Sequence, residues 1–271
     1  MTAATDGGSA IHYSSSFAYR PLQTSPQEIR LIRLLGAPSY EPIVCNIIHV
    51  EFNDENTQYE ALSYAWGEHK DRRTISVDGE RVSVTRNLAM ALQYLRDPIV
   101  DTIIWIDALC INQEDKMEKS IQVALMRDIY RHAEHVKMWL GPAANNSDTI
   151  MRVFNEEGPR LYAYTDEDTT SRMIYKGVAS AFGDEIDRLE EEMERVKAYL
   201  MDEGNSRLRR SLEALLKRDY WTRAWVVQEI VMAQKLTILC GLASSPWNHA
   251  VAVMALFHQA QQSSLPHGRD P

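Results

Sequence analysis

The chain has 271 residues, of which 45% are hydrophobic and 25% are charged, so it can bury one large core or two modest ones. Its formal net charge of −9 and its pI of about 5.4 disfavour a surface that neutralises phosphates. No basic stripe interleaved with aromatics is present either, so nucleic acid is not an expected partner.

The ends and the cysteines indicate a cytoplasmic protein. The first residues lack a basic end followed by an apolar stretch, and no apolar run reaches the roughly 20 residues that span a bilayer. Cys45, Cys110 and Cys240 lie far apart in strand-like apolar runs, which is typical of reduced core thiols. We therefore expect neither secretion nor a membrane span.

Residues 1–20 are small and polar and predict a flexible tail, whereas 21–271 predict a single domain. EIRLIRLL and IVCNIIHVEF predict an N-terminal β-rich extension, and YEALSYAWG predicts a strand that ends in a glycine turn. ISVDGERVSV has two alternating runs around Asp78-Gly79, which predicts a hairpin. TRNLAMALQYLRD predicts a helix that Pro98 stops.

The central part of the chain alternates between predicted strands and helices. IIWIDALCI, residues 103–111, is apolar except at Asp107 and predicts a strand buried on both faces. The loop NQEDKMEK, the helix IQVALMRDIYRHAEH and the strand VKMWLG follow. This order predicts an α/β fold with a parallel sheet flanked by helices, in which ligands bind at the carboxyl ends of the strands.

The composition changes between residues of about 143 and 217, where charged helical patterns predict a helical insertion. Its acidic run, GDEIDRLEEEMERVKAYLMDEG, is expected to be a solvated helix face. The helix around RAWVVQEIVMAQ and the strand KLTILCG then return to the sheet, and QQSSLPHGRDP predicts a mobile C-terminal end.

Motifs for familiar chemistries are absent. The glycines form neither a dinucleotide fingerprint nor a phosphate loop, and no G-x-S-x-G elbow is present. Cys110 has no recognisable histidine partner. His132 and His135 lie three apart on the predicted helix, but no further ligand completes a metal set, so surface histidines are the simpler interpretation and no metal is expected.

One carboxylate, Glu229, lies within the apolar helix RAWVVQEIVMAQ. The apolar residues on all sides of this helix predict burial on most faces, where a carboxylate is expensive unless it is paired, hydrogen bonded or open to a cleft. Two interpretations remain: a structural ion pair with Arg223 or another arginine, and a catalytic role.

Three stretches resemble the signature blocks of the fungal heterokaryon incompatibility (HET) domain family. They are YEALSYAWG, WIDALCINQEDKMEKSIQVALMRDIYRHAEHVKMWLG and RAWVVQEIVMAQKLTILCG. The resemblance implies a role in nonself recognition between filamentous fungi, as an effector domain that triggers cell death, with an upstream nonself-recognition protein as a possible partner.

The order of these blocks is also similar to that of TIR domains, which implies a TIR-like (flavodoxin-like) fold. Trp225 and Glu229 match the W-x-x-x-E motif whose glutamate is catalytic in NAD⁺-cleaving TIR domains. The insertion before this motif departs from the TIR pattern, as does Ala65-Trp66-Gly67, where TIR enzymes often carry a basic residue.

This resemblance implies a NAD⁺ glycohydrolase in which NAD⁺ is the substrate, no cofactor is needed and Glu229 is catalytic. The expected substrate-binding residues are Tyr64, Trp66, Gly67, Asp107, Asn112, Gln113 and Trp225. Tyr64 and Trp66 are equally well explained as packing residues. Asp107 is equally well explained as a loop cap, and Asn112 as the N-cap of the next helix.

The resemblance to TIR enzymes further implies activation by self-association. The corresponding loop, Asn112–Lys119, has mixed charge, which suits a polar subunit contact. An exposed helix start without a partner explains the same charges equally well.

Overall fold

The computed structural model describes residues 17–54, 56–165, 191, 193–199, 202 and 206–263. The chain divides into two compact units, the first made of residues 1–137 and 224–235 and the second of residues 138–223 and 236–271. Both units contain helices and strands, so the expected α/β class is confirmed.

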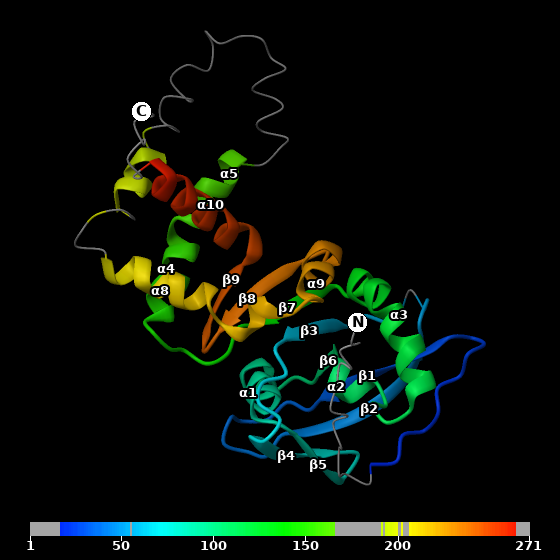
Figure 1. The fold of residues 1–271 in the computed structure, drawn as a ribbon. Helices are drawn as coiled ribbons and strands as arrows, with labels where there is room; N and C mark the ends of the chain where they lie inside the picture. Colours follow the sequence, from blue (N-terminus) through cyan, green and yellow to red (C-terminus); the bar gives the residue numbers. More distant parts are fainter. Residues whose placement is uncertain are drawn as a thin grey trace, which may run out of the picture. The chain divides into compact units, whose positions relative to one another are not determined.

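The first unit is built on a mixed β-sheet (Figure 1). Its strands are β1 (Glu28–Leu34), β2 (Val44–Glu51), β3 (Glu60–Tyr64), β4 (Arg72–Val77), β5 (Glu80–Thr85), β6 (Thr102–Trp105) and the start of β7 (His135–Trp139). They are hydrogen bonded in the order β5-β4-β2-β1-β6-β3-β7. β2 pairs parallel with β4 and β3 pairs parallel with β6, whereas β1 is antiparallel to both of its neighbours. The predicted parallel sheet is therefore confirmed only in part, because β3 and β6 are parallel but the sheet as a whole is mixed.

The predicted N-terminal extension forms the middle of this sheet. In β1 the side chains of Ile29, Leu31, Ile32 and Leu34 are at most 1% exposed, so the strand is buried on both faces. A connection of nine residues, 35–43, joins β1 to β2. Because parallel strands need a longer crossover, this short connection favours the observed antiparallel pairing.

Four helices of the first unit are described: α1 (Arg86–Leu95), α2 (Asp107–Cys110), α3 (Lys116–His132) and α9 (Val226–Met232). The start of α1 is capped by Thr85, whose Oγ1 accepts a hydrogen bond from the Leu88 backbone N–H. α3 and α9 pack against each other (Figure 1).

The segment 103–111 was expected to be one continuous strand, and this expectation is wrong. β6 ends at Trp105, and the next residues form the single helical turn α2. The carbonyl of Ile106 accepts a hydrogen bond from the Cys110 N–H, and Asp107 Oδ1 accepts one from the Ala108 N–H. These local bonds replace strand pairing, so Cys110 lies in a helix rather than in a strand.

The hairpin expected around Asp78-Gly79 is confirmed. β4 and β5 pair antiparallel with Val77 opposite Glu80, which leaves Asp78 and Gly79 as the turn. Both have positive φ, 51° and 82°, as a type I′ turn requires.

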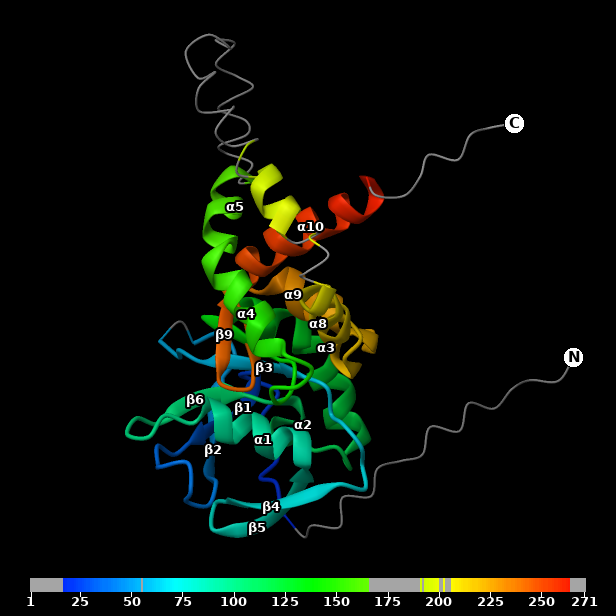
Figure 2. The same cartoon turned by 90° about the vertical axis from the view of Figure 1, so that its left-hand side faces the viewer.

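The second unit contains the end of β7, the strands β8 (Leu236–Cys240) and β9 (Ala243–Pro246), and several helices. Its described helices are α4 (Ser147–Glu156), α5 (Gly158–Thr165), α8 (Ser206–Leu216), the 3-10 helix η2 (Asp219–Thr222) and α10 (Trp247–Ser263). α4 packs with α5, α8 and α10 (Figure 2). Residues 193–199 are helical as well, whereas most of the predicted acidic helix lies outside the described residues.

Of the predicted flexible tail, residues 1–16 lie outside the described residues, and Tyr19 and Arg20 make defined contacts with the first unit. At the other end α10 runs to Ser263, so the first part of the predicted mobile end is helical. Residues 264–271 lie outside the described residues.

Alanine substitutions at Gly79 and Gly36 distinguish the cost of a positive φ from the cost of a steric clash. A Cβ at Gly79 would meet nothing within 4 Å, so Gly79→Ala suffers only from its positive φ, and we expect a loss of about 1 kcal/mol in the free energy of unfolding. A Cβ at Gly36 would lie 2.6 Å from the carbonyl carbon of Ile99, so Gly36→Ala should destabilise more. Denaturant unfolding of both variants checks the order, which equal losses would contradict.

Candidate functional site

An aromatic cleft lies in the first unit. Its walls come from the segment before β1, the end of β3, β5, α1, α2 and the loop between α2 and α3. The space between its walls is about 590 Å³ when the open solvent at its mouth is included, so the cleft is a shallow hollow rather than an enclosed cavity. The aromatic residues that line it are Phe17, Tyr19, Tyr64 and Trp66.

Of the predicted substrate-binding residues, this cleft brings together Tyr64, Trp66, Asn112 and Gln113. Phe17 and Tyr19 were not predicted to bind a ligand, because they fall within residues 1–20, which were expected to form a flexible tail. The stretch FAY, in which two aromatics follow a polar run, was the available signal. Leu88 of α1 and the β5 segment 82–85 complete the apolar wall, and no pattern in the sequence indicated that they would face Tyr64.

Asp107 lies behind the lining of the cleft and forms hydrogen bonds with two lining residues, Trp66 and Gln113. It is 8% exposed, and its Oδ2 accepts a hydrogen bond of 2.8 Å from Trp66 Nε1. Its backbone carbonyl accepts a hydrogen bond of 3.0 Å from Gln113 Nε2. Asp107 is not among the lining residues, so it orients Trp66 and Gln113 rather than facing the cleft itself.

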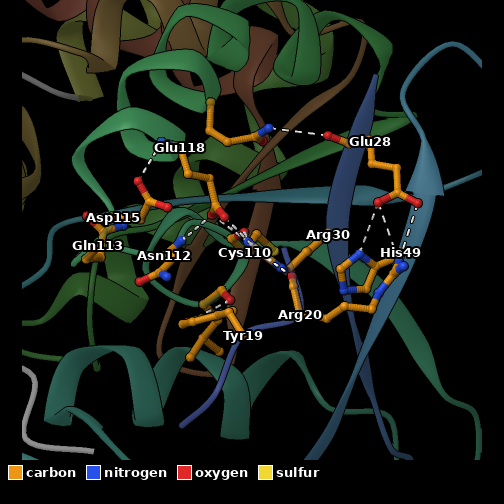
Figure 3. A network of polar contacts seen from close by, with 12 residues as sticks. Tyr19, Arg20, Glu28, Arg30, His49, Cys110, Asn112, Gln113, Asp115 and Glu118 are labelled. Atoms are coloured by element: carbon orange, nitrogen blue, oxygen red, sulfur yellow. Dashed lines mark hydrogen bonds and ion pairs between the residues drawn. The ribbon is translucent and has the colours of Figure 1, made fainter. Parts of the chain in front are cut away.

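A buried ion pair holds the loop beside the cleft (Figure 3). Arg30 is fully buried, and its Nη1 and Nη2 lie 2.6 and 2.9 Å from the two carboxylate oxygens of Glu118. Nη1 also donates to the Cys110 carbonyl and Nη2 to the Arg20 carbonyl. The Arg30 guanidinium lies 4.7 Å from the centre of the Tyr19 ring. One side chain thus joins three segments next to the cleft.

The loop Asn112–Lys119 is shorter than expected, because α3 begins at Lys116. Its N-cap is Asp115, whose Oδ1 accepts hydrogen bonds from the backbone N–H groups of Met117 and Glu118. The expectation that Asn112 caps this helix is therefore wrong. Asn112 instead accepts a hydrogen bond from the Glu114 N–H through its Oδ1.

Glu229 is buried, as expected, with 1% of its surface exposed. Ser63 Oγ of β3 donates a hydrogen bond to Glu229 Oε2. The helix around it is not buried on most sides, however, because Trp225, Val227 and Val231 are 47%, 66% and 66% exposed. Only the face of α9 that carries Glu229 is therefore buried.

Trp225 and Gly67 do not line the cleft. Trp225 is the N-terminal boundary residue of α9. Gly67 has a φ of 77°, and the close approach of Asn87 Cβ, 3.2 Å from a Cβ built at Gly67, explains the need for glycine at this turn.

The strand register places Glu229 and the cleft on opposite faces of the sheet. Successive side chains of a strand point to opposite faces, so Ser63, which binds Glu229, points away from Tyr64, which lines the cleft. Pairing of β1 with β6 and of β6 with β3 puts Arg30 on the Tyr64 face. The expected single site containing Glu229, Tyr64 and Trp66 is thus divided in this structure.

Other candidate chemistries find little support. All three cysteines are buried, and burial raises the pKa of Cys45 and of Cys110 to about 12, which makes them poor nucleophiles. His132 ends α3 whereas His135 begins β7, so the two do not share a helix. Within the described ranges, no three His, Cys, Asp or Glu side chains are grouped to hold a metal ion.

The buried ion pair should dominate local stability. We expect Glu118→Ala to lower the free energy of unfolding by about 3 kcal/mol, because it leaves a charged Arg30 buried without its carboxylate. The exposed ion pair of Asp71 with Arg86 is a matched control, since Asp71→Ala should remove less than about 1 kcal/mol. Denaturant unfolding of both variants measures the difference, and losses of similar size would contradict the central role of Arg30.

Within the part of the chain that is described, no helix has both the length and the apolar character needed to cross a bilayer.

Comparisons with known proteins identify the family. The sequence model described as "Heterokaryon incompatibility protein (HET)" matches residues 59–229, which is more than half of the chain. The chain is 30% identical over 233 residues to heterokaryon incompatibility protein 6, OR allele, of Neurospora crassa. This match covers 79% of the chain but only 33% of that relative, so the chain spans about a third of the relative's length. No solved structure matches, and the TIR-like fold therefore remains a prediction. The chain belongs to the heterokaryon incompatibility (HET) family.

Proposed function

We propose that this chain is an effector domain of heterokaryon incompatibility that triggers death of the cell from the cytoplasm. The family match and the name of the Neurospora relative support this role. Recognition of nonself is assigned to an upstream partner protein, as the family resemblance implies.

The proposed reaction is hydrolysis of the nicotinamide–ribose bond of NAD⁺, with Glu229 as the catalytic residue. The observation that carries this proposal is the nearly complete burial of the Glu229 carboxylate, held by Ser63 on a short helix. A desolvated carboxylate is expensive to maintain, so its presence on such a small element favours a functional role.

One carboxylate is sufficient for this chemistry. The bond between the ribose carbon and the pyridinium nitrogen breaks, and its electron pair stays on the nitrogen, so nicotinamide leaves as a neutral molecule. No general acid is needed, in contrast to ordinary glycosidases. Water adds to the cationic sugar carbon and loses a proton, which yields ADP-ribose. Glu229 would hold the ribose hydroxyls and stabilise the positive charge that develops on the sugar.

The proposal includes a movement that exposes Glu229, because 1% exposure does not admit a sugar. α9 is suited to such a movement. It has seven residues, of which only Val226 and Glu229 are buried, and no side chain caps its start. Segments with few buried apolar contacts open at low free energy.

Glu229→Gln tests the catalytic assignment. The amide keeps the shape of the side chain and can still accept the hydrogen bond from Ser63, but it lacks the negative charge. We expect nicotinamide release from NAD⁺ to fall at least about 100-fold, as when an electrostatic stabiliser is lost, and toxicity in cells to disappear. Chromatography of the released nicotinamide, with a melting curve on the same sample, measures activity and folding together.

Glu134→Gln is the matched control, because Glu134 is exposed in the same unit and undergoes the same chemical change. It should leave turnover unchanged. If Glu229→Gln melts well below the native protein and yet releases nicotinamide at the native rate per folded molecule, Glu229 is a structural residue and the catalytic assignment is wrong.

A second candidate function is a non-enzymatic module that kills by self-assembly and recruitment of a partner. The observation in its favour is the first turn of α3, where Lys116 and Lys119 are exposed and Met117 is 77% exposed. Glu118 turns inward to Arg30, so the exposed surface of this turn is more basic than the sequence suggested. In a chain with a net charge of −9, such a surface suits an acidic contact on a second copy.

Reversal of both charges, Lys116→Glu with Lys119→Glu, tests self-assembly. Acidic residues in the first turn of a helix are favourable, so the fold should persist while association weakens. Light scattering across protein concentration should show a shift toward monomer, and toxicity in cells should fall.

Lys70→Glu with Arg81→Glu is the control for net charge, because both residues are exposed in the first unit. This variant should associate as the native protein does. Equal effects of the two double variants would mean that overall charge, rather than the α3 surface, controls association.

A further inference from the structure

We infer that the aromatic cleft of the first unit is a binding site for a flat heteroaromatic ring that bears a carboxamide-type edge and no negative charge. We further infer that this site binds its ligand without Glu229. The inference goes beyond the proposed hydrolysis of NAD⁺, because it concerns a separate site and stands whether or not the bond is cleaved.

The shape of the cleft favours a planar ring. Four aromatic side chains line it, contributed by the segment before β1 and by the end of β3 with the turn that follows. Trp66 is fixed in orientation by the hydrogen bond from its Nε1 to Asp107 Oδ2. Aromatic faces bind other flat rings by stacking or by edge-to-face contact, at little entropic cost when their orientation is already fixed.

Two neighbouring amides supply a donor and an acceptor. Asn112 Oδ1 accepts the Glu114 backbone N–H, which leaves Nδ2 as the donor that can face a ligand. Gln113 Nε2 donates to the Asp107 carbonyl, which leaves Oε1 as the acceptor. Because backbone groups fix both orientations, the pair is complementary to a group that offers one acceptor and one donor side by side, as a carboxamide does.

The charges of the side chains in and behind the lining disfavour the binding of an anion in the cleft. Among the described residues that line the cleft there is no Lys, Arg or His, and Glu114 is the one charged side chain. Buried Asp107 adds a second carboxylate behind Trp66. A ligand that brings a carboxylate or a phosphate into this cleft would meet like charge and no cation among the lining side chains, because Arg30, beside Tyr19, is already paired with Glu118.

The ion pair of Arg30 with Glu118 keeps the cleft in its binding shape (Figure 3). Glu118 Oε1 accepts a hydrogen bond of 2.8 Å from the Asn112 backbone N–H. The Tyr19 hydroxyl donates to the Leu109 carbonyl, and Arg30 lies over the Tyr19 ring. The donor amide and one aromatic wall are therefore held in place before a ligand arrives, which favours binding.

Nicotinamide and nicotinate form a matched pair of probes, since they differ only in a carboxamide against a carboxylate. We expect nicotinamide to bind the full chain with roughly millimolar affinity, as befits a small fragment. Nicotinate should bind at least about tenfold more weakly. Protein-observed NMR titration of the two probes measures both affinities. Equal affinities, or no binding of nicotinamide, would overturn the inference.

Three variants decide whether this cleft is the site. Asn112→Asp keeps the acceptor for the Glu114 N–H but removes the donor, and it should weaken nicotinamide binding at least about tenfold. Asn53→Asp makes the same change at an exposed position of the same unit and should bind as the native protein does. Glu229→Gln should also bind nicotinamide normally.

Binding lost in Glu229→Gln, or retained in Asn112→Asp, would contradict a separate cleft site. Failure of the proposed hydrolysis looks different, because it appears as absent NAD⁺ cleavage with nicotinamide binding intact.

Discussion

The first unit depends on one buried electrostatic interaction, the pairing of Arg30 with Glu118. A guanidinium with no exposed surface must find its compensation inside the protein, and it does so by binding a carboxylate at two points and two backbone carbonyls. These partners belong to the segment before β1, to α2 and to the start of α3. Their positions relative to β1 are therefore coupled, and the aromatic cleft takes its shape from that coupling. A loop that looked like solvated surface in the sequence is in fact tied to the middle of the sheet.

Local patterns predicted those features that local forces determine. The hairpin at Asp78-Gly79 is the clearest case, because it needs only two residues with positive φ at its turn. The partner of Arg30 could not be predicted in this way, because Glu118 lies 88 positions further along the chain. EIRLIRL contains two arginines on opposite faces of one strand, and only the tertiary structure shows that Arg30 is buried while Arg33 is exposed.

The apolar character of α9 was a misleading signal, for a physical reason. A helix of seven residues that covers a sheet with one face can bury only a small part of its side chains, and here Val226 and Glu229 take that position. Val227 and Val231 face outward, and Ile230 and Met232 are only partly covered. The sequence therefore indicated correctly that Glu229 is buried, but it did not indicate that few of the other side chains of α9 are buried. The small number of buried side chains in α9 supports the proposed movement that exposes Glu229, because segments with few buried apolar contacts open at low free energy.

The division of the predicted site by β3 constrains every functional hypothesis for this chain. Ser63 and Tyr64 are adjacent, yet one contacts Glu229 and the other lines the cleft, because strand residues alternate between faces. A single dinucleotide would have to contact both faces of the sheet to reach both places. If it does so, its ring belongs in the aromatic cleft and its ribose beside Glu229. If it does not, the cleft and the carboxylate serve different ligands. The enzymatic hypothesis thus requires a ligand that reaches Glu229, which is buried, whereas the signalling hypothesis requires only the exposed first turn of α3.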